Sequence, residues 1–287
     1  CCRYKTPVAT YTGDLISILD SKEYEKLRQD SIEGIKNINC SKCYLEEKLG
    51  TKSLRQKFND IYGTDTVELK YLEIGFDNIC NLTCDGCWGE WSSAWSKKLN
   101  PDLPNSAHYT SIDEIITIPQ TLEKIVFLGG EPLQTNRHSS FLAKLTNLQD
   151  IELTYYTNGM FLIKDIELLK KAKEVNMILS IDAVGELNEK VRSGSNWNQI
   201  SKFIDQIKEL KFNLSIHSVL HLNNWHGIAE LEKFVNTLDV NWVVNPLTYP
   251  TNLDVRNIIN KKDITNLIKT TNIPNKEYIL GFINNAN

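Results

Sequence analysis

Short apolar runs alternate with amphipathic runs from residue 71 onward, and this alternation narrows the possible folds more than any other pattern in the chain. Apolar runs rich in strand-forming residues cover 71–77, 124–128, 151–156, 177–182, 212–219 and 240–245. Apolar residues at helical spacing follow in 163–175, 197–210 and 228–238. Strands that alternate with helices favour a parallel sheet covered by helices, so the sequence predicts an α/β fold.

Three cysteines, Cys80, Cys84 and Cys87, follow the first predicted strand with C-x3-C-x2-C spacing. Closely spaced thiolates bind iron–sulfur clusters, zinc or copper(I). Structural zinc sites usually combine two C-x2-C pairs or mix cysteine with histidine, and the next histidine is His108. The spacing therefore favours a cluster over zinc, and three ligands would leave one cluster iron open to a substrate.

Further motifs stand at the ends of the next predicted strands. They are Gly129-Gly130-Glu131-Pro132, Thr157-Asn158-Gly159 and Ser180-Ile181-Asp182. Together with the cysteines, in this order, they resemble the motifs of the radical S-adenosylmethionine (radical SAM) superfamily. The resemblance covers roughly residues 71–250 and implies an open, partial (β/α)6 TIM-like barrel, with its site at the carboxyl ends of the strands.

The resemblance also implies roles for individual residues. Cys80, Cys84 and Cys87 would hold a [4Fe–4S] cluster whose fourth iron binds the amino and carboxylate groups of SAM. Gly129 and Gly130 would let the backbone approach SAM, and Glu131 would accept a hydrogen bond from the SAM ammonium. Ser180 and Asp182 are expected near the SAM ribose or carboxylate, and Arg192 near the carboxylate. Alternatively, Asp182 caps the next helix and Arg192 is a solvated surface residue.

One position departs from the family pattern. The family usually has a large residue immediately before the third cysteine, packed near the adenine of SAM, whereas this chain has Gly86. Trp88 could supply that contact instead. Trp88, Trp91 and Trp95 lie in an irregular connection over residues 88–110, where they either cover the cluster or pack the loop onto the barrel.

The N-terminal region carries a second group of cysteines: Cys1, Cys2, Cys40 and Cys43. It resembles the SPASM/twitch auxiliary-cluster segment of radical SAM enzymes, placed before the barrel. The resemblance implies an auxiliary iron–sulfur cluster, with a zinc-stapled subdomain as the alternative. We therefore expect an auxiliary segment over residues 1–65, the barrel over 66–250 and a helical extension over 251–287.

Composition excludes some classes of function. The 287 residues carry 32 basic and 36 acidic side chains, a net charge of −4, and no basic block that suggests nucleic-acid binding. The sequence contains no run of 18 apolar residues, so no membrane helix is expected, and no signal peptide is visible. Clustered cysteines are more typical of metal ligands than of disulfides, so we expect a reducing, cytoplasmic location.

The sequence thus predicts a radical SAM enzyme that receives electrons from a reductase such as flavodoxin or ferredoxin and abstracts hydrogen from a peptide or small molecule. Tyr155 and Tyr156 could donate a hydrogen atom or only pack. His217, His221 and His226 are interpreted as ordinary core or loop residues. The alternatives are a SAM-binding regulatory protein without radical turnover and a zinc-stapled scaffold protein.

Overall fold

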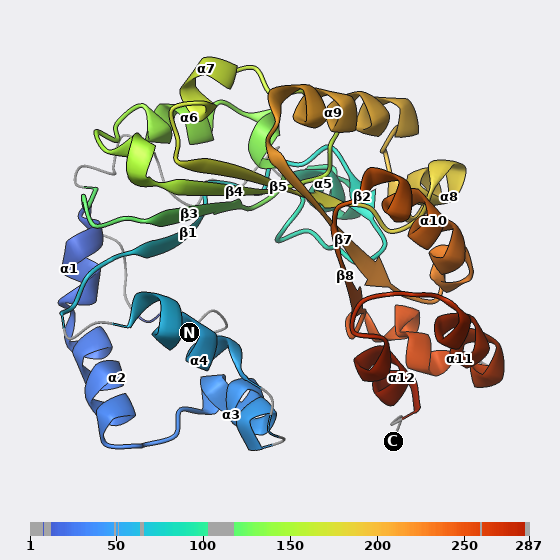
Figure 1. Cartoon of the computed structure of the whole chain (residues 1–287), viewed down its shortest axis with the longest axis horizontal. Helices are drawn as coiled ribbons and strands as arrows, with labels where there is room; N and C mark the ends of the chain where they lie inside the picture. The colour runs from blue at the N-terminus through green and yellow to red at the C-terminus, as the bar shows by residue number, and fades with distance from the viewer. Residues whose placement is uncertain are drawn as a thin grey trace.

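A six-stranded parallel sheet forms the centre of the computed structural model, which describes residues 8, 13–48, 50, 52–63, 66–102, 118–258 and 260–284 (Figure 1). The strands are β1 (Tyr71–Gly75), β3 (Lys124–Leu128), β4 (Glu152–Thr157), β5 (Glu174–Ser180), β7 (Asn213–Leu220) and β8 (Asn241–Pro246). Their spatial order follows the chain, β1-β3-β4-β5-β7-β8, and every neighbouring pair is parallel. The predicted α/β partial barrel is confirmed.

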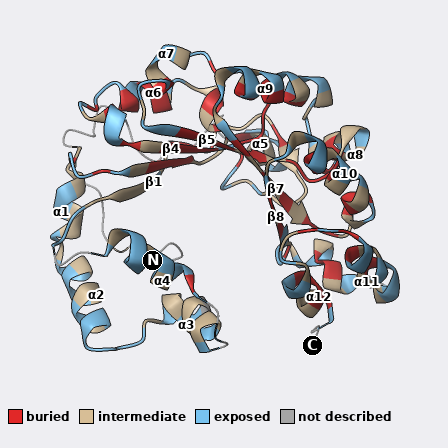
Figure 2. Ribbon diagram, in the orientation of Figure 1, coloured by how far each residue is buried: buried red, intermediate tan, exposed pale blue. Residues whose placement is uncertain are grey.

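Helices cover one face of this sheet. They are α6 (Arg137–Leu142), α7 (Ile166–Leu169), α8 (Gly185–Val191), α9 (Trp197–Leu210) and α10 (Ile228–Leu238). Helix α9 occupies its predicted range because Ile200, Phe203, Ile204 and Ile207 form one apolar stripe, and all four are buried. Figure 2 shows buried residues concentrated between the sheet and these helices, where the core lies.

The two faces of the sheet differ because successive strand residues point to opposite sides. In β5, Val175, Met177 and Leu179 are buried beneath the helices, whereas Asn176, Ile178 and Ser180 are half-buried on the other, inner face. In β4 the same alternation buries Tyr155 completely and leaves Tyr156 36% exposed. Of the two tyrosines, only Tyr156 reaches the inner face, and Tyr155 packs in the core.

Tyr155 anchors a buried polar contact beneath α6. Its ring stacks on Phe127 with centroids 4.7 Å apart, and its Oη lies 3.0 Å from Nδ1 of His138. Burial lowers the pKa of His138 to about 4, from an ordinary value of 6.5. The folded state therefore holds this imidazole neutral at neutral pH.

This neutral histidine predicts a pH dependence of stability. Because the folded-state pKa of His138 is depressed, the stability it contributes is complete above pH 6.5 and is lost as the pH falls toward about 4. We expect the difference in free energy of unfolding between the wild type and His138→Gln to narrow over this range in urea titrations. A constant difference would show that His138 takes up its proton without cost.

The N-terminal part forms α1 (Leu15–Leu19), α2 (Lys22–Ile32), α3 (Ser41–Lys48) and α4 (Leu54–Tyr62). The sequence predicts a helix over 22–31 that Asp20-Ser21 can cap, and Ser21 does cap α2. It also predicts a helical run through 49–56, but the described residues 50, 52 and 53 are not helical. Ser53 begins a new helix there, with a capping box to Gln56. Figure 1 shows these helices on the opposite side of the sheet from α6 and α7, and Phe58 of α4 packs on Tyr71 of β1 with ring centroids 4.8 Å apart.

Two other helical predictions need correction. The helix expected over 163–175 shortens to α7, because Glu174 and Val175 already pair with β4 as the start of β5. The irregular connection 88–110 contains a helix, α5 (Ser93–Leu99), which the sequence pattern did not reveal. The helix start predicted at residues 111–114 lies outside the described residues.

The C-terminal region is helical, as expected, with α11 (Lys261–Thr270) and α12 (Lys276–Asn284). Asn275, just before α12, joins this region to the sheet by donating from Nδ2 to the carbonyl of Val244 in β8 at 2.9 Å. Among the described residues, no helix combines the length and apolarity that a membrane crossing requires.

Candidate active site

The three cysteines lie on one loop between β1 and α5, at the carboxyl ends of the strands. Cys80, Cys84 and Cys87 all carry free thiols and are half-buried. The Gly129–Glu131 loop after β3 and the Thr157–Gly159 turn after β4 reach the same loop. The fold therefore brings together motifs that are dispersed in the sequence.

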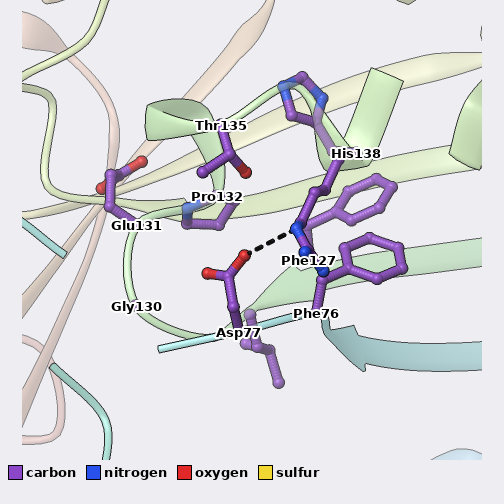
Figure 3. A pocket seen from close by; sticks show the side chains of 10 residues that line it. Phe76, Asp77, Phe127, Gly130, Glu131, Pro132, Thr135 and His138 are labelled. Atoms are coloured by element: carbon purple, nitrogen blue, oxygen red, sulfur yellow. Dashed lines mark ion pairs between the residues drawn. The ribbon is translucent and has the colours of Figure 1, made fainter. Parts of the chain in front are cut away.

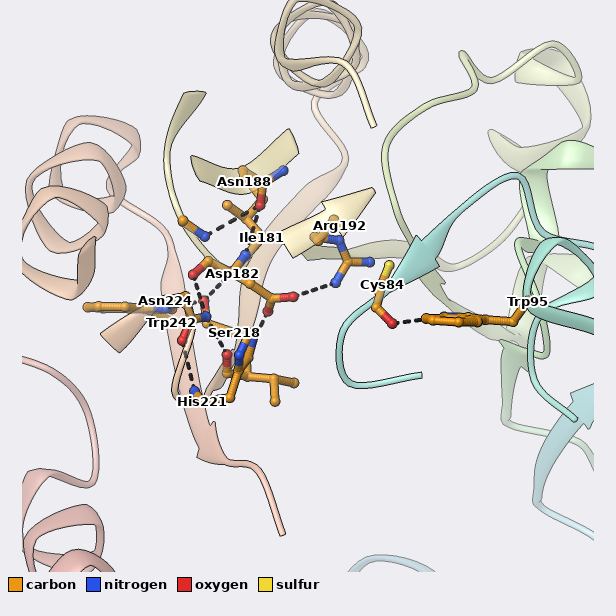
Figure 4. A network of polar contacts seen from close by, with 12 residues as sticks. Cys84, Trp95, Ile181, Asp182, Asn188, Arg192, Ser218, His221, Asn224 and Trp242 are labelled. Atoms are coloured by element: carbon orange, nitrogen blue, oxygen red, sulfur yellow. Dashed lines mark hydrogen bonds and ion pairs between the residues drawn. The ribbon is translucent and has the colours of Figure 1, made fainter. Parts of the chain in front are cut away.

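Helix α5 fastens the cysteine loop through its first turn. Ser92 donates from Oγ to the carbonyl of Leu82 at 2.7 Å, and Ser93 Oγ accepts from the Cys80 amide at 3.1 Å. Trp95 donates from Nε1 to the carbonyl of Cys84 at 2.9 Å (Figure 4). Of the two roles predicted for these tryptophans, Trp95 therefore packs the loop in place.

Removing the Trp95 contact is expected to loosen the cysteine loop. Trp95→Phe keeps an aromatic ring and leaves the half-buried carbonyl of Cys84 without this donor, which costs about 1 kcal/mol. We expect slower reconstitution with iron and sulfide, measured by visible absorbance. Trp91→Phe alters a residue that is 48% exposed and serves as the control. Equal reconstitution rates for the two variants would contradict the role given to Trp95.

The Gly129–Glu131 loop packs directly on the cysteine loop. The Glu131 amide donates to the carbonyl of Ile79 at 2.7 Å, and a Cβ on Gly130 would lie 2.2 Å from that same oxygen. Gly129 has a φ of +117°, and its Cβ would lie 2.6 Å from the carbonyl of Asp77. Both glycines are thus required for contact between the two loops, a role that the sequence reasoning missed.

Glu131 is 2% exposed and links this loop to the end of β4. Its Oε1 accepts from Thr157 Oγ1 at 2.8 Å and from the Leu133 amide at 3.0 Å, and its Oε2 accepts from the Asn158 amide at 2.6 Å. Burial raises the pKa of Glu131, although these hydrogen bonds oppose the shift. A bound cation beside the carboxylate would favour its ionised form.

Beside the Gly129–Glu131 loop lies a small pocket that includes Asp77, Thr135 and His138 (Figure 3). Arg137 Nε pairs with Asp77 Oδ2 at 3.2 Å, and Asp77 Oδ1 accepts from the Ile79 amide at 2.9 Å. Asp77 therefore ties the start of the cysteine loop to α6. The sequence analysis did not single it out.

Asn158 contacts the cysteine loop. Its Nδ2 donates to Asn81 Oδ1 at 3.0 Å and approaches Cys80 Sγ at 3.9 Å. Hydrogen bonds to ligand sulfurs influence the properties of iron–sulfur clusters. The position of Asn158 at the end of a predicted strand was the signal available in the sequence.

Arg192 and Asp182 form a buried ion pair on the other side of the loop. Arg192 Nη1 lies 2.8 Å from Asp182 Oδ2, and their side chains are 12% and 7% exposed. Figure 4 shows the sulfur of Cys84 turned toward this guanidinium. Burial alone would lower the pKa of Arg192, but the thiolate form of Cys84 and the carboxylate of Asp182 raise it above its ordinary value.

Both alternative roles for these two residues are wrong. The sequence predicts Ser180 and Asp182 on one strand, but β5 ends at Ser180 and Asp182 lies beyond it. The N-cap of α8 is Val184 rather than Asp182. Asp182 Oδ1 instead accepts from the Val219 amide at 2.7 Å. Arg192 is not a solvated surface residue, because it pairs with Asp182 in the interior.

The cysteine loop fits an iron–sulfur cluster in its donor chemistry. Burial raises the pKa of all three thiols, that of Cys84 to about 11, while the charge of Arg192 opposes the shift. Binding to iron would displace these protons. Within the described chain, no three His, Cys, Asp or Glu side chains form a group that could hold a single metal ion.

Gly86 and Trp88 have different neighbours. A Cβ on Gly86 would lie 3.2 Å from Cδ1 of Leu247, so Leu247 occupies the space beside this position. Trp88 is 37% exposed and packs edge-on against Tyr249, with ring centroids 5.3 Å apart. The adenine contact of Trp88 remains a prediction.

The second cysteine group is only partly described. Cys40 ends a short 3-10 helix, Ile38–Cys40, and Cys43 lies one turn further on in α3; both are free, half-buried thiols. Cys1 and Cys2 lie outside the described residues. Of the three histidines considered, His217 lies on the inner face of β7 beside Tyr156, with ring centroids 5.5 Å apart, and His221 is buried after that strand.

Comparison with known proteins identifies the class that this fold and cysteine loop define. The sequence profile of the radical SAM superfamily matches residues 75–235, more than half of the chain. The protein therefore belongs to the radical SAM superfamily.

Particular relatives are GTP 3',8-cyclases. The enzyme of Aquifex aeolicus (strain VF5) is 31% identical over 182 residues, which cover 60% of this chain and 54% of that protein. A probable GTP 3',8-cyclase of Methanococcus aeolicus is 28% identical, covering 60% of this chain and 58% of that protein. The chain thus spans about half the length of the curated relatives it matches.

A solved structure of native anSMEcpe with bound AdoMet has a similar fold. Its TM-score is 0.50 at 18% sequence identity, and the match covers 70% of this chain and 59% of that one. This likeness concerns the fold alone.

Proposed function

We propose that this radical SAM enzyme reductively cleaves SAM at a [4Fe–4S] cluster held by Cys80, Cys84 and Cys87. The observation that carries the proposal is the presence of three free thiols on one loop, which contacts with α5, Glu131, Asn158 and the strand of Arg192 hold in place. When bound, the cluster supplies one electron to SAM, which gives methionine and a 5′-deoxyadenosyl radical that abstracts hydrogen from the substrate.

The residues around the loop would bind and orient SAM. Glu131 Oε2 accepts one hydrogen bond, from Asn158, and a carboxylate oxygen can accept two, so it can also receive the SAM ammonium. Ser180, Asp182 and Arg192 are the candidates for contacts to the ribose and carboxylate. Gly129 and Gly130 would bring the backbone close to the same ligand.

We also propose an auxiliary cluster in a twitch/SPASM-like segment over residues 1–65, preceding a barrel over 66–250 and an extension over 251–287. Cys40 and Cys43 are one helical turn apart, which suits two ligands of one centre. Cys1 and Cys2 are the proposed partners, and iron–sulfur is preferred to zinc. A reductase of the flavodoxin or ferredoxin class would supply electrons.

A peptide is the proposed substrate, and a nucleotide is the second candidate because the named relatives are GTP 3',8-cyclases. The inner face of the sheet favours the peptide. Glu73, in the middle of β1, presents an exposed carboxylate to which the Tyr71 hydroxyl donates at 2.6 Å. A triphosphate against this strand would meet negative charge.

The experiment is anaerobic reconstitution of the full chain with iron and sulfide, followed by reduction, addition of SAM and mass spectrometry of 5′-deoxyadenosine. We expect 5′-deoxyadenosine above the level of a protein-free control. A protein that holds its cluster but releases none would support a regulatory SAM-binding protein instead. A parallel reaction with GTP tests the second candidate. Deuterium transfer from deuterated GTP into 5′-deoxyadenosine would show that the substrate is the nucleotide rather than a peptide.

A further inference from the structure

The Arg192–Asp182 pair places a fixed positive charge next to the cysteine loop. Both side chains are nearly buried, and Arg192 Nε is buried without a hydrogen-bond partner. Asp182 is itself immobilised, because its Oδ1 accepts from Val219 and its carbonyl accepts from Asn224 Nδ2 at 2.8 Å. A guanidinium stays charged at all relevant pH values, so this charge is permanent.

Backbone pairing places Arg192 beside the cysteine loop. The short strands β2 (Thr83–Cys84) and β6 (Arg192–Ser193) pair antiparallel, with Arg192 directly opposite Cys84. The Asp85 amide also donates to the carbonyl of Val191 at 2.9 Å. The strand pair therefore fixes the backbone of Arg192 opposite Cys84, and the ion pair with Asp182 fixes the guanidinium at the end of the side chain.

We infer that Arg192, held by Asp182, is a positioning residue whose charge makes the proposed cluster easier to reduce. The inference rests on the proposed function. In the step concerned, an external one-electron donor is oxidised and the cluster gains one electron, with no bond formed or broken. A buried cation stabilises the added negative charge strongly because little water screens it. Asp182 opposes this effect in part, so loss of either residue shifts the equilibrium in the opposite direction from loss of the other.

This role differs from a direct contact between Arg192 and the SAM carboxylate. The Nη1 group of Arg192 is already committed to Asp182. A contact with SAM would affect SAM affinity, whereas the inferred role affects the cluster before SAM is added. Measurements without SAM therefore separate the two roles.

The test is a redox titration of the reconstituted full chain without SAM, followed by electron paramagnetic resonance. At a solution potential that reduces half of the wild-type cluster, Arg192→Gln is expected to lower the ratio of reduced to oxidised cluster on the order of tenfold. Arg192→Lys retains the charge and should stay near the wild type, and Asp182→Asn should raise the ratio. Arg256→Gln is the matched control, because it breaks the Arg256–Asp254 pair (2.6 Å), whose arginine lies over Phe282 of α12.

Opposite shifts for Arg192→Gln and Asp182→Asn would support the inference, since general disruption of the loop would move both in one direction. An unchanged ratio in Arg192→Gln would overturn it, whether or not SAM affinity falls. If Arg192→Gln fails to take up iron, Asp182→Asn still decides the sign, and an unchanged or lowered ratio in that variant would overturn the inference. If the wild-type protein takes up no cluster, the proposed function is overturned as well. If the loaded protein cleaves SAM but the variants leave the ratio of reduced to oxidised cluster unchanged, this inference alone is overturned.

Discussion

Cys84→Ala is expected to abolish 5′-deoxyadenosine formation and to prevent assembly of the cluster on the cysteine loop. Cys84 is the central thiol of the three, it lies opposite Arg192 in a strand pair, and its carbonyl is held by Trp95. Two thiolates cannot replace three as ligands of a four-iron cluster, so the loss should be complete. Iron and sulfide analysis and mass spectrometry of 5′-deoxyadenosine provide the measurements.

Cys43→Ala is the matched control for this experiment. Cys43 is also a free, half-buried thiol, but it lies in α3 of the N-terminal part. We expect this variant to lose only the proposed auxiliary cluster and to keep the EPR signal of the cluster on the cysteine loop. Formation of 5′-deoxyadenosine by Cys84→Ala at the wild-type rate would show that Cys84 is not a ligand.

Gly130→Ala is expected to destabilise the protein by about 3 kcal/mol, because the added methyl group meets backbone rather than a movable side chain. It would lie 2.2 Å from the carbonyl oxygen of Ile79 and 2.5 Å from the carbonyl carbon of Asn78. The two loops must separate to admit it, which also breaks the bond from the Glu131 amide to Ile79. Urea unfolding of the apo-protein measures the change, and cluster uptake should fall with it.

Gly281→Ala makes the same chemical change in a different setting. Gly281 lies within α12, and an added Cβ there has no heavy atom within 4 Å. Alanine favours the helix over glycine, so we expect a gain of about 0.5–1 kcal/mol. If Gly130→Ala proves as stable as the wild type while Gly281→Ala behaves as expected, the close packing of the two loops is wrong.

The elements that depend on local periodicity were predictable. Helices α9 and α10 and strand β3 occupy their predicted ranges, because a single apolar stripe or a compact strand run defines each of them. The helix expected over 163–175 was too long because Val175 fits both the apolar helical face and the apolar alternation of β5. Helix α5 was missed because it is only seven residues long and largely polar, and Ser92 is its only local start signal.

The candidate site was predictable only where it consists of a continuous motif. The cysteines and the Gly129–Glu131 loop stand in the sequence as recognisable segments. The contact of Asn158 with Cys80 spans 78 positions, and the contact of Asn223 with Asp85 spans 138. Such contacts depend on how the strands curve toward one another, so no local sequence pattern predicts them. The pairing of Arg192 with Asp182 likewise required the structure.

We propose that three thiolates leave one cluster iron open to SAM. Electron–nuclear double resonance of the reduced protein with SAM carrying ¹⁵N in its amino group tests this most directly. We expect a coupling between the cluster spin and the labelled nitrogen that appears on addition of SAM and is absent in Cys84→Ala. SAM binding to the loaded wild type without any such coupling would contradict the claim.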